Sequence, residues 1–282
     1  MILYPKVEHT ALIRGLWKQV FEDSDAYLDL YFSKLYAAEH SLIIMEDSNL
    51  CASLQMLPCS LSIKGKFISA AYIFAVMTAP NSRRKGYMTS LMESALKELK
   101  NKNVTLAVLI PQEEYLFGVY AKYGFKAVFE LNECELLLPD SSDNILVFTP
   151  AIEVAYEFYV SYYSLHFPSI IPSRNHFETV CLNLKQEGGL LLAIGDIDIK
   201  ALCFLVTPPE SVTIIDILAI DENAEMNLLS GIRKMTGFEM AVCKKRAILD
   251  SNKVFGMACI LDEKELGWND LDGAYMSLMM ND

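Results

Sequence analysis

Three consecutive cations, Arg83, Arg84 and Lys85, stand directly before Gly86 and a helical pattern near 86–100. The first N–H groups of a helix have no partner inside the helix, and the helix dipole adds positive potential at the same end. Cations there are slightly unfavourable unless an anion relieves them, whereas Gly86 permits a positive φ or a close approach of a ligand. The stretch therefore indicates a phosphate site; the alternative is a solvated basic loop with an ordinary turn glycine.

This junction does not match the common nucleotide motifs. It lacks the G-x-x-x-x-G-K-[ST] pattern of a P-loop and the three spaced glycines of a dinucleotide fingerprint. At the equivalent position of the second half, the chain instead has Asp221, Glu222 and Glu225, which would repel an anion. We expect phosphate binding at the first junction only, with the second half serving as a support or as a wall of the substrate site.

The elements around the basic junction can be read from hydrophobic patterns. Two short helices and three β-rich segments in a meander come first, and the third of these, 66–79, runs into the junction. The nearly continuous apolar run 104–111 predicts a buried strand, 113–124 a helix, and 126–138 a pair of strands. The polar, proline-bounded segment 139–150 is a candidate linker.

The second half repeats this order of helices and strands without a residue-by-residue repeat. A chain of 282 residues, 52% of them hydrophobic, suits two domains. We predict a first domain at 1–139 and a second at 140–282.

Two landmarks at the expected separation resemble the GNAT N-acetyltransferase superfamily. Residues 83–88 are similar to its R/Q-x-x-G-x-G/A acetyl-coenzyme A loop, and "VYAKYGF", 119–125, resembles its later tyrosine and glycine-phenylalanine landmark. The resemblance covers residues 1–135 and implies an α+β or α/β fold of tandem GNAT-like domains. Each would have a mixed, mostly antiparallel sheet flanked by helices, and the second would be degenerate. Met88 departs from the glycine or alanine that is usual at its position.

The opening helices, the methionine in the loop and the degenerate second half are similar to the enhanced-intracellular-survival type, which carries tandem domains. We expect the chain to lack the sterol-carrier-like domain of that group. We therefore expect a shortened, two-domain relative.

The resemblance implies which residues would hold acetyl-CoA. The backbone of the strand before the loop would pair with the pantetheine arm, as an added strand would. The amides from Arg84 onward would hold the pyrophosphate, with the cations neutralising its charge. The implied cofactor-binding residues are Val76, Met77, Thr78, Arg83, Arg84, Lys85, Gly86, Tyr87, Met88 and Thr89.

The resemblance also implies direct attack of an amine on the thioester, without a covalent enzyme intermediate. Tyr120 matches the tyrosine near the coenzyme sulfur, where it would protonate the thiolate; otherwise it is a core aromatic, and Tyr123 is the stand-in. The base could be the terminal carboxylate, here at Asp282, unless the tail merely completes the second domain. Glu22, Asp23, Glu113 and Glu114 are further acids near expected loops, with surface positions as the default.

Composition narrows the partners and the compartment. A net charge of −12 argues against nucleic acid and suits a cationic small molecule or a lysine-type amine as acceptor. Seven scattered cysteines without a C-x-x-C pair indicate reduced thiols and a cytoplasmic protein. We expect no membrane span, and the four isolated histidines predict no metal site. The favoured function is an acetyl-CoA-dependent N-acetyltransferase; the alternative is a non-catalytic CoA-binding or scaffolding module, and the oligomeric state is not readable.

Overall fold

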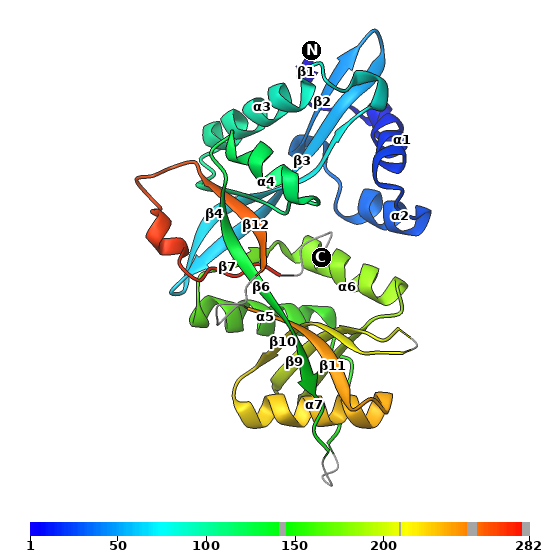
Figure 1. Cartoon of the computed structure of the whole chain (residues 1–282), viewed down its shortest axis with the longest axis vertical. Coiled ribbons are helices and arrows are strands. Elements are labelled where there is room, and N and C mark those ends of the chain that lie inside the picture. Colours follow the sequence, from blue (N-terminus) through cyan, green and yellow to red (C-terminus); the bar gives the residue numbers. More distant parts are fainter. Residues whose placement is uncertain (141–144, 209, 247–252, 278–282) are drawn as a thin grey trace. The chain divides into compact units, whose positions relative to one another are not determined.

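The computed structural model describes residues 1–140, 145–208, 210–246 and 253–277 (Figure 1). These residues fold into two compact units, each with a sheet covered by helices. Unit 1 contains Met1–Leu61, Lys66–Phe129 and Phe255–Asp272, and unit 2 contains Ser62–Gly65, Glu130–Val254 and Gly273–Asp282. Both are mixed α+β units.

The strands of unit 1 are spread along the chain, from its first residues to a strand near its far end. Its helices are α1 (Thr10–Phe21), α2 (Asp25–Lys34), α3 (Tyr87–Asn101) and α4 (Glu114–Ala121). Its strands, in sheet order, are β1 (Ile2–Leu3), β2 (Ser41–Glu46), β3 (Asn49–Ile63), β4 (Lys66–Thr78), β5 (Leu106–Leu109) and β12 (Lys253–Ile260). β2 and β3 are antiparallel, as a meander requires, whereas β4 and β5 are parallel because α3 connects them.

Side chains on both faces of β4 are apolar. Helices therefore bury both faces of the unit 1 sheet. Phe74 contacts Trp17 of α1 and Tyr31 of α2, with ring centroids 5.4 and 5.7 Å apart. The neighbouring Ile73 belongs to a core on the other face with residues of α3 and α4. Figure 1 shows α1 and α2 on one side of this sheet and α3 and α4 on the other. α3 contributes the apolar stripe Leu91, Met92, Ala95 and Leu99.

Unit 2 has a five-stranded sheet between two helical layers. Its helices are α5 (Ile152–His166), α6 (Arg174–Gln186) and α7 (Glu222–Thr236), and β7 (Ser169–Pro172) lies between the first two in sequence. The sheet order is β6 (Lys126–Leu137), β11 (Met240–Arg246), β10 (Thr213–Ala219), β9 (Ile199–Val206) and β8 (Leu190–Gly195). Leu202 and Phe204 pack with α5 and α6, whereas Ala201 and Cys203 pack with α7. This alternation is the period of two that a strand imposes.

Two strands make the compact units differ from the expected domains 1–139 and 140–282. β6, predicted as a pair of strands, is one strand, and its residues Leu131–Leu137 pair antiparallel with β11. β12 comes from the far end of the chain, yet Met257–Ile260 pair antiparallel with β5. Unit 1 therefore needs a strand that follows most of the sequence of unit 2. This pairing is long-range, so no local pattern revealed it.

The segment expected as a linker, 139–150, is only partly described, since 141–144 lie outside the described residues. Its second part is fixed in unit 2, because Phe148 and Ala193 exchange backbone hydrogen bonds of 3.0 and 2.8 Å. Val147 packs against α7 so closely that a Cβ on Gly231 would lie 2.1 Å from its Cγ2. These contacts make 145–150 part of the folded unit.

Candidate functional site

The junction between β4 and α3 is an exposed, positively charged turn. Arg83, Arg84 and Lys85 are all exposed, and Arg84 and Gly86 have φ of 64° and 82°. Gly86 is the N-cap of α3, and a Cβ added there would meet no atom within 4 Å. The left-handed backbone alone is a reason for glycine at this position.

The N-terminus of α3 offers N–H groups that the helix itself does not use. The intrahelical ladder begins at the Ser90 N–H, which donates to the Gly86 carbonyl at 3.0 Å. The N–H groups of Tyr87, Met88 and Thr89 precede it. In the described part of the chain, α3 has no side-chain cap and no acidic residue in its first turn. An anion here would receive backbone donors, the positive end of the dipole and the neighbouring cations.

In unit 2, the N-terminus of the corresponding helix, α7, is capped by a carboxylate of the helix itself. Asp221 is the N-cap of α7, and its Oδ1 accepts the Ala224 N–H at 2.7 Å. Glu222 and Glu225 lie in the first turn of the same helix. The dipole of α7 is thus already matched by negative side chains, which agrees with the expected difference between the two junctions.

Strand β4 carries an irregularity just before the residues expected to pair with a pantetheine arm. Its register with β5 runs from Ala70 to Tyr72, and Ala75 then has φ of 47° although it is no glycine. Such a residue is strained, and strained residues cluster where function needs them. Beyond Ala75, Val76 and Thr78 are half-buried.

Two further details limit how these β4 residues could contact a ligand. The Met77 side chain is 1% exposed and lies in the core, so only its backbone is available. The Thr78 carbonyl accepts a 3.4 Å hydrogen bond from Nε of Arg83, which ties the basic loop back to the strand end. One cation of the loop is therefore already oriented by the fold.

Tyr120 lies in the core of unit 1, the position that its alternative interpretation as a core aromatic predicts. It is 7% exposed and packs edge-on against Phe125, with ring centroids 6.1 Å apart. Burial, with smaller contributions from Tyr115 and Tyr123, raises the pKa of Tyr120 to about 12. The phenol is therefore neutral at physiological pH, a state that suits a hydrogen-bond donor rather than a base.

Two tyrosines connect the α3 N-terminus to its surroundings. The Tyr123 hydroxyl lies 2.9 Å from Oγ1 of Thr89 in the first turn of α3. A hydrogen bond with Glu46 raises the pKa of Tyr87 to about 12. The sequence indicated only a backbone role for Tyr87 and no contact between Tyr123 and Thr89. The single available signal was the place of Tyr123 in the second landmark.

The acids considered as a general base have mostly structural or surface positions. Asp23 accepts the indole N–H of Trp17 at 2.7 Å. Glu22 is the left-handed C-cap of α1, and Glu113 and Glu114 are exposed. Asp282 lies outside the described residues.

Other chemistries find little support in the described residues. They hold no group of three histidine, cysteine or acidic side chains that could bind a metal, and none of their helices is long and apolar enough to cross a membrane. Burial lowers the pKa of His176 to about 3, so this imidazole is neutral. All seven cysteines are free thiols.

Comparison with known proteins connects this geometry to a family. Residues 6–128 match the family model described as an acetyltransferase (GNAT) domain. No curated protein matches the chain.

Solved structures share the fold over nearly the whole chain at low identity. A probable N-acyltransferase of unknown function from Enterococcus faecalis V583 is 17% identical with a TM-score of 0.79, over 93% of this chain and 72% of that one. A GCN5-related N-acetyltransferase from Anabaena variabilis ATCC 29413 is 16% identical with a TM-score of 0.79, over 93% and 73%. Eis1 from Mycobacterium abscessus is 12% identical with a TM-score of 0.73, over 94% and 75%. The tandem GNAT-like fold expected from the sequence is confirmed.

Proposed function

From the GNAT acetyltransferase domain that residues 6–128 form, we propose that the protein transfers an acetyl group from acetyl-CoA directly to a primary amine. The observation that carries the proposal is the uncapped N-terminus of α3, which follows three exposed cations and a left-handed Gly86. Such a terminus suits a diphosphate, because the backbone donors and the positive charge converge on one place.

The coenzyme would contact two neighbouring segments of unit 1. The pyrophosphate would accept hydrogen bonds from the amides between Arg84 and Thr89, with Arg83, Arg84 and Lys85 close by. The pantetheine arm would run along the backbone of Val76, Met77 and Thr78, beyond the strained Ala75. Met88 fits this role because only its N–H is needed and its side chain packs against the core.

The reaction needs a neutral amine and a protonated leaving group. The amine nitrogen forms a bond to the thioester carbonyl carbon, the carbon–sulfur bond breaks, and the nitrogen loses a proton while the sulfur gains one. Tyr120 would stabilise the leaving thiolate by donating its hydroxyl proton in a hydrogen bond, because its phenol stays protonated.

The proposal also names a general base and a class of acceptor. We assign the base to the carboxylate of Asp282. Removing residues 278–282 should then lower turnover and leave acetyl-CoA affinity intact; unchanged turnover would exclude this assignment. The net charge of −12 favours a cationic acceptor, such as a small-molecule amine or a lysine side chain. Seven free thiols suit a reducing compartment, which supports the cytoplasm.

A release assay tests the activity. Coenzyme A thiol is measured with a panel of amines for the intact chain and for Tyr120→Phe, and acetyl-CoA binding is measured beside it by calorimetry. We expect the variant to lose at least about tenfold in turnover with unchanged affinity. Binding without turnover over the whole panel would instead favour a non-catalytic CoA-binding or scaffolding module. No binding at all would refute both functions.

A further inference from the structure

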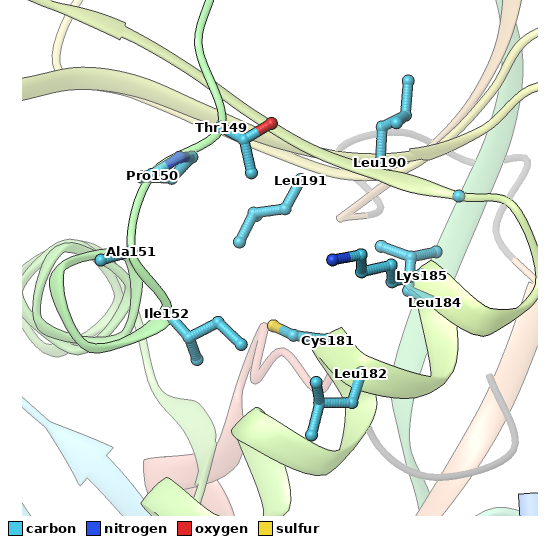
Figure 2. Close-up of a pocket in the computed structure, with 11 residues that line it drawn as sticks. Thr149, Pro150, Ala151, Ile152, Cys181, Leu182, Leu184, Lys185, Leu190 and Leu191 are labelled. Atoms are coloured by element: carbon cyan, nitrogen blue, oxygen red, sulfur yellow. The ribbon is translucent and has the colours of Figure 1, made fainter.

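Unit 2 contains a cavity of about 370 Å³ that has no place in the proposed reaction (Figure 2). It lies between the residues that lead into α5, the second half of α6 and the start of β8. Ile152, Leu184, Leu190 and Leu191 supply apolar walls. A space of this size lies near the lower end of the ~300–1,000 Å³ range of small-molecule pockets.

The walls of the cavity are held by tight packing. The turn from α6 to β8 passes through Gly189, where an added Cβ would lie 2.4 Å from Cδ1 of Leu184 and 2.9 Å from the Leu205 carbonyl oxygen. Cys181 and Leu184 are also members of the core of unit 2. The cavity is therefore a shaped feature of the folded unit rather than a gap between surface side chains.

One cation faces this apolar space. Of the eleven lining residues, Lys185 alone carries a charge, and Figure 2 shows its nitrogen pointing into the open centre of the cavity. Among the described residues, Lys185 has no ion pair, in contrast to Lys200, whose Nζ lies 3.0 Å from Asp196. A cation in the last turn of α6 suits the helix dipole, but the dipole does not explain an apolar cavity beside it.

No lining group competes with Lys185 for a negative ligand. The sulfur of Cys181 also points into the space (Figure 2), but burial raises the pKa of this thiol to about 12, so it stays neutral. Thr149 adds one hydroxyl to the lining. The lining thus combines apolar walls, one ammonium group and one neutral hydroxyl.

We propose that this cavity binds a monocarboxylic acid with a single aliphatic chain, with the chain between Ile152, Leu184 and Leu191 and the carboxylate at Lys185. The apolar walls favour a hydrocarbon chain, since each methylene that leaves water for an apolar environment stabilises the complex. The ammonium group favours the carboxylate and disfavours an amine of equal length. The site is independent of the proposed acetyl transfer, whose acceptor would be a cation.

The test uses octanoate as the probe on the full chain, with octanol and octylamine as comparators of equal chain length. Binding is measured by calorimetry, and thermal melting confirms that each variant is folded. We expect octanoate to bind more tightly than octanol and octylamine to bind most weakly. Equal affinity for octanoate and octylamine would overturn the proposal.

Two variants locate the site. Lys185→Met should weaken octanoate roughly tenfold, as expected for a charge-assisted contact, and leave octanol unchanged. Lys234→Met, in the last turn of α7 and away from the cavity, is the matched control and should change neither. Ile152→Trp should fill the space and abolish binding of all three probes. Octanoate binding that survives both Lys185→Met and Ile152→Trp would place the ligand elsewhere and refute the site.

Discussion

The hydroxyl groups of Tyr123 and Thr89 lie 2.9 Å apart, which joins the residues after α4 to the first turn of α3. Thr89 is exposed and Tyr123 half-buried, so the contact lies at the edge of the N-terminus proposed to hold the diphosphate. The bond links Tyr123 of the second sequence landmark to Thr89, which directly follows the first landmark and lies 34 residues earlier.

Tyr123→Phe removes this bond and keeps the ring. We expect acetyl-CoA affinity to fall by a few-fold, because a partly exposed hydrogen bond contributes about 0.5–1.5 kcal/mol. Tyr120→Phe should show the opposite pattern, with lost turnover and intact affinity. Calorimetry and the thiol-release assay on both variants measure the two effects. If only Tyr123→Phe lost turnover at saturating acetyl-CoA, Tyr123 rather than Tyr120 would be the proton donor to the leaving thiolate.

Gly86→Ala tests the left-handed turn. Space is no obstacle, so the expected cost is the strain of a positive φ, about 1–2 kcal/mol of unfolding free energy, together with a weaker acetyl-CoA complex. Gly237, which ends α7, has φ of 77° and equally open surroundings. Gly237→Ala is therefore a matched control that should lose similar stability and no affinity. Urea unfolding measures the loss of stability, and calorimetry measures the loss of acetyl-CoA affinity. Equal acetyl-CoA affinity in both variants would contradict a role for the Gly86 turn in binding.

Replacing two cations of the loop tests the charge. Arg84→Met combined with Lys85→Met should weaken acetyl-CoA by about tenfold or more at low salt, and the difference from the unchanged protein should shrink as salt is added. Lys97→Met, on the exposed side of the same helix, is the control. Titrations at two ionic strengths measure the effect. If the double variant binds acetyl-CoA as tightly as the unchanged protein at both salt concentrations, the electrostatic basis of the proposed site is refuted.

Asp216 predicts a pH dependence of stability in unit 2. Its buried carboxylate accepts hydrogen bonds from Tyr163 at 2.7 and 2.8 Å and from Tyr275 at 3.3 Å, and burial raises its pKa from 3.8 to about 6. Between these two pH values the folded state holds more protons at this group than the unfolded state. The contribution of Asp216 is therefore fully present below about pH 4 and is lost as pH rises towards 6 and above.

The measurement compares urea unfolding of the unchanged protein with that of Asp216→Asn at pH 4 and pH 7. The stability of the unchanged protein relative to the variant should fall by about 2–3 kcal/mol between these values, following 1.36 kcal/mol per pKa unit. Both proteins retain His176, whose lowered pKa acts in the opposite direction, so its effect cancels. Parallel pH profiles would show that Asp216 does not titrate in this range.

Local patterns were sufficient for most elements of both units. The helix expected near 86–100 is α3 at Tyr87–Asn101, since Gly86 and the apolar stripe mark its start and its buried face. The basic loop and the acidic start of α7 were also visible, because charge and glycine position are properties of neighbouring residues. Residues 126–137 form one strand rather than the expected pair, and 145–150 of the expected linker are held in unit 2, because the partners of both segments are distant in sequence.

The sequence by itself indicated the basic glycine turn and the candidate Tyr120, and through the resemblance of these two motifs it indicated the tandem GNAT-like fold, because each motif consists of residues close together in the chain. Only the tertiary structure decided that β12 completes the sheet of unit 1 beside β5, that Tyr123 meets Thr89, and that Lys185 faces an apolar cavity. These relationships join residues distant in sequence or depend on side-chain direction. Hydrophobic periodicity specifies which face of an element is buried but not which element covers it.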